Sequence, residues 1–122
     1  MRVLVCGGRD YHDYKKVSEV LGDLYYSLSH EEQNCFVLIS GGARGADTLA
    51  RRWAQNYLPG FSFMGFRADW KSYGLSAGPK RNAQMLEEGK PDLVLAFPGG
   101  KGTADMVKKA RAAKVKVEEI DG

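Results

Sequence analysis

The chain lacks the features that mark disulfide-rich, metal-binding or membrane-spanning proteins. Its 122 residues include two cysteines, Cys6 and Cys35, without CxxC spacing, so we expect buried free thiols rather than a disulfide or a zinc site. No apolar run approaches the roughly 18 residues that a membrane span needs, and the apolar N-terminal stretch is too short for a signal peptide. We therefore expect a cytoplasmic protein with no metal, cofactor or membrane partner.

A strong charge imbalance is also missing. The 18 Lys and Arg residues outweigh the 15 Asp and Glu residues by a net charge of only +3. This excess suits an anionic small molecule, but it is far from the basic footprint of a dedicated nucleic-acid binder, so we do not expect a nucleic-acid partner. The length suits a single domain, residues 1–122, with its own hydrophobic core.

What the sequence has is a regular alternation of strand and helix patterns. Apolar runs typical of buried strands lie at 3–6, 36–39, 61–66 and 93–96, and an alternating edge strand is predicted at 114–120. Helical spacing begins after Asp13, the expected N-cap, and recurs at 46–57, 80–88 and 104–113, whereas 29–34 is predicted to be a polar connection. This order predicts an α/β fold, a Rossmann-like, doubly wound, open parallel sheet with about five strands and four helices.

Glycine-rich turns punctuate this pattern at residues 7–8, 41–45, 77–78 and 99–102. Glycine lets the backbone approach an anion closely, and the free N–H groups of a following helix point at it. Thr103 is expected to cap the last helix. We expect the amides near Gly8, Gly42, Gly78 and Gly100 to face one hollow at the carboxyl edge of the sheet, where such folds bind ligands.

Three arginines, Arg9, Arg44 and Arg81, lie in or beside these turns. The planar guanidinium group suits bidentate contact with phosphate. We expect Arg44 and Arg81 to neutralise a phosphate group that the last glycine turn holds through its backbone.

The loop after the third predicted strand carries further candidates. Asp69 lies about 20 residues beyond the second glycine turn, where an acidic side chain can accept hydrogen bonds from ribose, although it can equally cap a local turn. Trp70 and Tyr73 can stack on a base or pack on the core, and the sequence leaves both alternatives open.

Two carboxylates, Asp10 and Asp47, are the best placed for general acid or base chemistry. Asp47 has an alternative role, because an acidic residue in the first turn of a helix also interacts favourably with the helix dipole. His12 is expected to be an exposed polar residue.

Five motifs in order resemble a known family: GGRDY at 7–11, SGGARGAD at 40–47, ADW at 68–70, AGPKRN at 77–82 and FPGGKGT at 97–103. Together they look like the YspA group, relatives of YpsA within the SLOG superfamily, which also includes the DprA proteins and the Lonely-guy phosphoribohydrolases. The resemblance implies a Rossmann-like, SLOG-like domain that binds nucleotides or nucleotide-derived molecules, and a homodimer.

The enzymes of that superfamily cleave the N-glycosidic bond of nucleoside monophosphates with an arginine and a glutamate. The resemblance places Arg81 at the arginine and Met106 at the glutamate. A thioether cannot transfer a proton, and the neighbouring Asp105 is rotated by about 100° around the helix. Hydrolysis would therefore need Asp10 or Asp47 as the carboxylate.

The sequence thus predicts binding of a nucleoside phosphate or an ADP-ribose-like ligand, with Arg81, Asp10 and Asp47 as catalytic candidates if the bond is hydrolysed. One alternative is a sensor or sequestering protein for a nucleotide signal, without turnover. Another is a single-stranded DNA-binding accessory protein, which needs a more basic surface. The predicted ligand-binding residues are Gly7, Gly8, Arg9, Ser40, Gly41, Gly42, Arg44, Gly45, Asp69, Trp70, Tyr73, Gly78, Asn82, Pro98, Gly99, Gly100, Lys101, Gly102 and Thr103.

Overall fold

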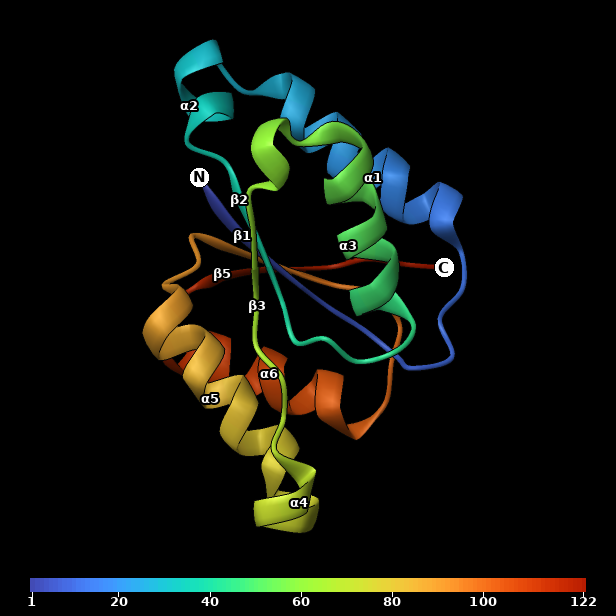
Figure 1. Cartoon of the computed structure of the whole chain (residues 1–122), viewed down its shortest axis with the longest axis vertical. Coiled ribbons are helices and arrows are strands. Elements are labelled where there is room, and N and C mark those ends of the chain that lie inside the picture. The colour runs from blue at the N-terminus through green and yellow to red at the C-terminus, as the bar shows by residue number, and fades with distance from the viewer.

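A five-stranded parallel sheet runs through the middle of the molecule in a computed structural model that describes residues 1–122 (Figure 1). Its strands are β1 (Arg2–Cys6), β2 (Val37–Ser40), β3 (Phe63–Gly65), β4 (Leu93–Ala96) and β5 (Lys116–Glu119). Their order is β3-β2-β1-β4-β5, and every neighbouring pair is parallel. The order reverses between β1 and β4, as in a doubly wound sheet, so the predicted fold class is confirmed.

Helices cover both faces of the sheet (Figure 1). On one face lie α1 (Tyr14–Ser27) and α3 (Ala46–Tyr57), and on the other lie α5 (Ala77–Gly89) and α6 (Lys101–Ala112). Two short helices, α2 (His30–Asn34) and α4 (Trp70–Tyr73), and 3₁₀ turns at Pro59–Phe61 and Gly74–Ser76 complete the chain. None of these helices combines the length and the apolar character of a bilayer span.

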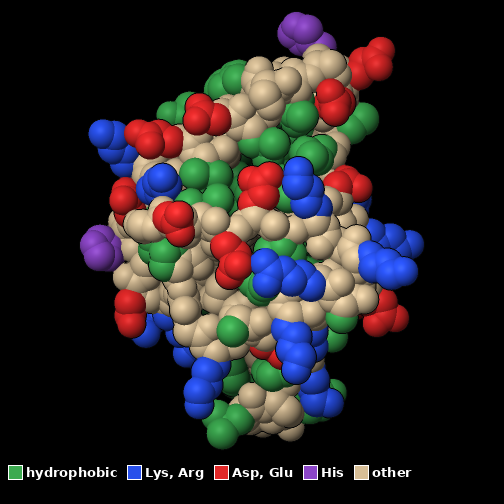
Figure 2. All heavy atoms as spheres, turned by 180° about the vertical axis from the view of Figure 1, so that it is seen from behind, with side chains coloured by type: hydrophobic (Ala, Val, Ile, Leu, Met, Phe, Trp, Pro, Cys, Tyr) green, Lys and Arg blue, Asp and Glu red, His purple; other side chains and the backbone are tan.

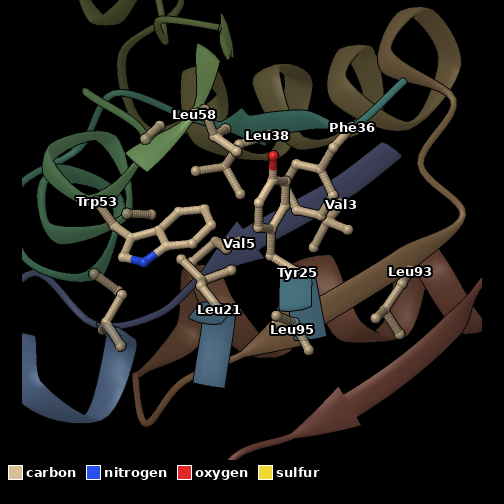
Figure 3. Packing of buried hydrophobic residues seen from close by; sticks show 14 of the residues in the cluster. Val3, Val5, Leu21, Tyr25, Phe36, Leu38, Trp53, Leu58, Leu93 and Leu95 are labelled. Carbon is tan, nitrogen blue, oxygen red and sulfur yellow. The ribbon is translucent and has the colours of Figure 1, made fainter. Parts of the chain in front are cut away.

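The two faces of the sheet carry separate hydrophobic clusters. Along β1, Val3 and Val5 pack under α1 and α3, whereas Leu4 and Cys6 pack under α5 and α6, because successive side chains of a strand point to opposite faces. Figure 3 shows the first cluster, in which the fully buried Trp53 of α3 lies near Val5. The sheet is thus anchored from both sides, and its carboxyl edge is held in place.

The two cysteines are free but differ in exposure. Cys6 is buried, as predicted, and burial raises the pKa of its thiol to about 12, so the thiol is neutral and unreactive at neutral pH. Cys35 is exposed, so the prediction of a buried thiol is wrong there. The physical reason is that Cys35 forms the C-terminal cap of α2, which buries none of its residues.

Helix boundaries confirm one predicted cap and correct another. Asp13 caps α1, since its carboxylate accepts a hydrogen bond of 3.0 Å from the amide of Lys16. Thr103 does not cap α6, which begins at Lys101 after the N-cap Gly100. The glycine lets the chain enter the helix earlier than predicted, so Thr103 lies within the first turn.

The segment at 29–34 is a helix rather than the predicted polar connection. Ser29 and Glu32 form a capping box, in which the Ser29 hydroxyl accepts from the Glu32 amide and the Glu32 carboxylate accepts from the Ser29 amide. These hydrogen bonds hold the pKa of Glu32 below its usual value. A reciprocal cap of this kind stabilises even a single helical turn.

Three loops at the carboxyl edge contact one another through their backbones. The amide of Gly8, after β1, donates to the carbonyl of Pro98, after β4, at 2.9 Å. The carbonyl of Gly8 accepts from the amide of Ala46, after β2, at 3.2 Å. A Cβ atom at Gly45 would collide with the Gly8 carbonyl, and one at Gly99 would lie 2.6 Å from the Gly8 nitrogen. Glycine is therefore required where these loops meet.

Gly45→Ala tests this contact, because φ at Gly45 is +78° and its Cβ would lie 2.7 Å from the Arg9 carbonyl carbon. We expect a loss of more than about 2 kcal/mol in the free energy of unfolding. Gly22→Ala, in the middle of α1 with no atom within 4 Å of the added Cβ, should instead gain roughly 0.5–1 kcal/mol. Urea denaturation compares the two, and equal stabilities of the two variants would contradict the close contact.

Candidate functional site

A cavity of about 310 Å³ lies beyond the carboxyl ends of β1, β2 and β3. The end of the molecule that carries α4 gathers Lys and Arg side chains on the face seen in Figure 2. The cavity is lined by Arg9, Gly41, Gly42, Ala43, Arg44, Arg67, Ala68, Trp70 and Arg81. Four arginines from four separate segments thus surround one space, and no acidic residue lines it.

Arg81 is held against the turn after β2. Its Nη1 donates to the carbonyl of Gly41 at 2.6 Å, and its Nε donates to the side-chain oxygen of Asn82 at 3.1 Å. Burial lowers the pKa of Arg81, while Asp47 opposes this change. Nη2 has no hydrogen-bond partner in the protein, so this end of the guanidinium group is available to a ligand.

Asn82, predicted to bind the ligand, joins Arg81 to α6 instead of lining the cavity. The residue is 4% exposed, and its Nδ2 donates to the carbonyl of Gly102 at 3.1 Å and to Asp105 at 3.0 Å. Asp105 also pairs with Lys109 at 2.7 Å, and its pKa is lowered by these donors against the opposing effect of burial. Asn82 therefore fixes the orientation of Arg81.

Trp70 lies at the rim of the cavity, with the Arg9 guanidinium 5.1 Å from its ring centroid. The ring edge also covers Gly78, which lies inside α5. Asp69 caps α4, accepting from the amide of Ser72 at 3.1 Å, which is the structural alternative left open for it. Both Asp69 and Tyr73 lie outside the cavity lining.

The remaining predicted residues fall outside this cavity. The expectation that four turns direct their amides into one hollow is wrong at Gly8, whose amide donates to Pro98. Gly78 lies in the first turn of α5 and does not line the cavity. At Gly8, the backbone amide that we expected to face a ligand is instead hydrogen-bonded to the loop after β4. Asp10 is exposed beside the first turn. The predicted residues that do not line the cavity are Gly7, Gly8, Asp10, Ser40, Gly45, Asp47, Asp69, Tyr73, Gly78, Asn82, Pro98, Gly99, Gly100, Lys101, Gly102 and Thr103.

Arg67 is a lining residue that the sequence analysis missed. It follows the end of β3 by two residues, so it occupies the same kind of position as Arg9 after β1 and Arg44 after β2. Its position just after a predicted strand could have identified it, because the carboxyl ends of parallel strands lie at the same edge of a sheet.

Asp47 lies in the first turn of α3 and is 6% exposed. Its Oδ2 accepts from the amide of Ala43 at 3.0 Å. Burial raises the pKa of this carboxyl to about 6, although hydrogen bonding and Arg81 partly offset the effect. Asp47 is therefore a buried carboxyl group that titrates near neutrality, as a general acid or base does.

The raised pKa of Asp47 makes the stability of the protein depend on pH. The folded state favours the protonated carboxyl. The stabilisation that Asp47 contributes to folding is therefore complete below pH 3.8 and is lost as the pH rises through about 6. Asp47→Asn removes this dependence. The difference in unfolding free energy, variant minus wild type, should rise by about 2 kcal/mol between pH 4 and pH 7. A difference that stays flat across this range in urea denaturation would show that burial does not perturb Asp47.

Comparisons with known proteins show which family the chain belongs to. Residues 1–73 match the model of YAcAr, the YspA, cpYpsA-related SLOG family. This region includes Arg9, Arg44, Arg67 and Trp70. The chain is also 38% identical over 121 residues to the Gene 61 protein of Mycobacterium phage D29, covering 95% of this chain and 93% of that protein. The chain therefore belongs to the YspA, cpYpsA-related SLOG family, whose membership indicates, at a coarse level, binding of a nucleotide-related ligand.

Proposed function

We propose that this protein binds a phosphorylated, nucleotide-derived ligand whose phosphate lies among Arg9, Arg44, Arg67 and Arg81. The observation that carries the proposal is the cavity itself, which is lined by four arginines and no acidic residue. Family membership adds the nucleotide-related character of the ligand.

None of these arginines forms an ion pair within the protein, although Asp47 lies close enough to Arg81 to affect its pKa. The three ion pairs of the structure, Lys109–Asp105, Arg111–Glu119 and Lys116–Glu118, involve none of the four. Like charges gathered in one cavity repel one another, and a bound anion converts that repulsion into attraction. Phosphate fits this role because a guanidinium group can donate two parallel hydrogen bonds to its oxygens.

The phosphate is assigned to the arginines rather than to the segment at 98–103, which includes the first turn of α6. That segment lies outside the cavity lining, and the backbone of Pro98 and the position of Gly99 are committed to the contact with Gly8. Arg81 and Arg44 keep the neutralising role predicted for them, and Arg9 and Arg67 extend the site across the loops after β1 and β3.

Hydrolysis of the N-glycosidic bond is a second candidate function, and Asp47 is the observation that favours it. Met106 is a thioether buried in the core, and the carboxylate of Asp105 is paired with Lys109, so neither position supplies a free carboxylate. The pKa of Asp47, about 6, suits a general acid or base. Mass spectrometry of nucleoside monophosphates incubated with the protein would detect the free base. Base release that persists in Asp47→Asn would exclude this role, and no release at all would leave binding without turnover.

Removing one cavity arginine should weaken binding without unfolding the protein. For the tightest binder among AMP, GMP, CMP, UMP and ADP-ribose, we expect Arg44→Ala and Arg67→Ala each to raise Kd by roughly 10-fold or more, since a charged hydrogen bond contributes about 1.5–3 kcal/mol. Isothermal titration calorimetry measures the change, and added salt should weaken wild-type binding further.

Arg111→Ala is the matched control, because it removes the same charge from an exposed ion pair with Glu119 near the C-terminal end of α6. Its Kd should stay within about twofold of the wild type. Equal losses in Arg44→Ala and Arg111→Ala would indicate a general charge effect and would contradict the site.

A further inference from the structure

A second cavity, of about 390 Å³, adjoins the arginine cavity on the α3 side of β2. Gly42, Ala43 and Arg67 line both spaces. The turn after β2 therefore forms a common wall, around which one molecule can occupy both cavities.

The second cavity exists because β3 has a glycine where a side chain would fill the space. Gly65 pairs with Ser40 in the parallel register of β2 and β3. Its side-chain direction alternates to the same face as Phe63, which packs under α3. A Cβ atom at Gly65 would already lie 3.2 Å from the Phe63 ring. The glycine that weakens β3 as a strand thus leaves a recess against the sheet.

The lining of this recess differs in chemistry from the arginine cavity. The ring of Phe63 offers apolar surface, with the Arg51 guanidinium 5.9 Å from its centroid, whereas Ser40, Asp47 and Thr48 contribute polar groups. The Phe66 ring packs on the other face of the sheet, against α5. The Ser40 side chain is fully buried, and its Oγ has no hydrogen-bond partner in the protein. A buried hydroxyl without a partner is rare in folded proteins, and a bound molecule can supply the missing hydrogen bond.

We propose that the second cavity receives the nucleobase of the ligand whose phosphate lies among the four arginines. The base lies against Phe63, and its polar edge hydrogen-bonds to Ser40 and Asp47. Arg67, which lines both spaces, stands between the two parts of the ligand. This inference rests on the proposed function, and it makes the protein selective for a base as well as for phosphate.

The test compares ligands that share the phosphate but differ in the base. We expect at least one of AMP, GMP, CMP and UMP to bind the wild type about tenfold or more tightly than ribose 5-phosphate in calorimetric titrations. Gly65→Val fills the recess with a side chain suited to a strand. It should abolish that advantage while leaving the Kd for ribose 5-phosphate within about twofold, which also shows that the variant is folded.

Ser40→Ala provides a second variant that removes only the unpartnered hydroxyl. The melting temperature should not fall, since no hydrogen bond within the protein is lost, whereas the Kd for the preferred nucleotide should rise about fivefold or more. Ribose 5-phosphate binding should be unchanged.

The outcomes separate this inference from the proposed function. If ribose 5-phosphate and all four nucleotides bind the wild type equally, or if Gly65→Val and Ser40→Ala keep the advantage of the nucleotide, the second cavity does not hold the base and the phosphate site stands. If neither ribose 5-phosphate nor any nucleotide binds the wild type, the proposed function fails and this inference fails with it.

Discussion

The backbone contact among the loops after β1, β2 and β4 is the constraint on which the rest of the site depends. Gly8 donates to Pro98 and accepts from Ala46, and a side chain at Gly45 or Gly99 would collide with it. Because these contacts involve main-chain atoms, they fix the directions in which the loops leave the sheet. The arginines after β1 and β2 are thereby brought to one cavity rather than spread over the surface.

The two cavities on either side of the β2 turn have complementary character. The arginines of the first cavity form no ion pair within the protein, and the recess beside it combines the Phe63 ring with Ser40 and Asp47. Arg81 and Asn82 connect the first cavity to α5 and α6 through hydrogen bonds of 2.6–3.1 Å. A rigid anion-binding site next to a less charged recess is the arrangement expected for a phosphorylated ligand with a ring at its other end.

The sequence allowed the fold and the sheet edge to be predicted, because apolar runs, helical spacing and caps such as Asp13 are local signals. Ser29 and Glu32 already carried the capping-box signal that makes α2 a helix. The contact among Gly8, Gly45 and Gly99 joins residues far apart in the chain, so the glycines were interpreted as ligand contacts. Arg67 could not be identified as a site residue from the glycine turns, because none lies in its loop. The recess at Gly65 could not be predicted either, since it depends on the register of β2 and β3.

A crystal structure of the protein with its tightest-binding nucleotide would test the central claim most directly. The account predicts phosphate oxygens within hydrogen-bonding distance of at least two of Arg9, Arg44, Arg67 and Arg81. A nucleotide whose phosphate lies instead at the first turn of α6, with all four guanidinium groups free of it, would contradict the account.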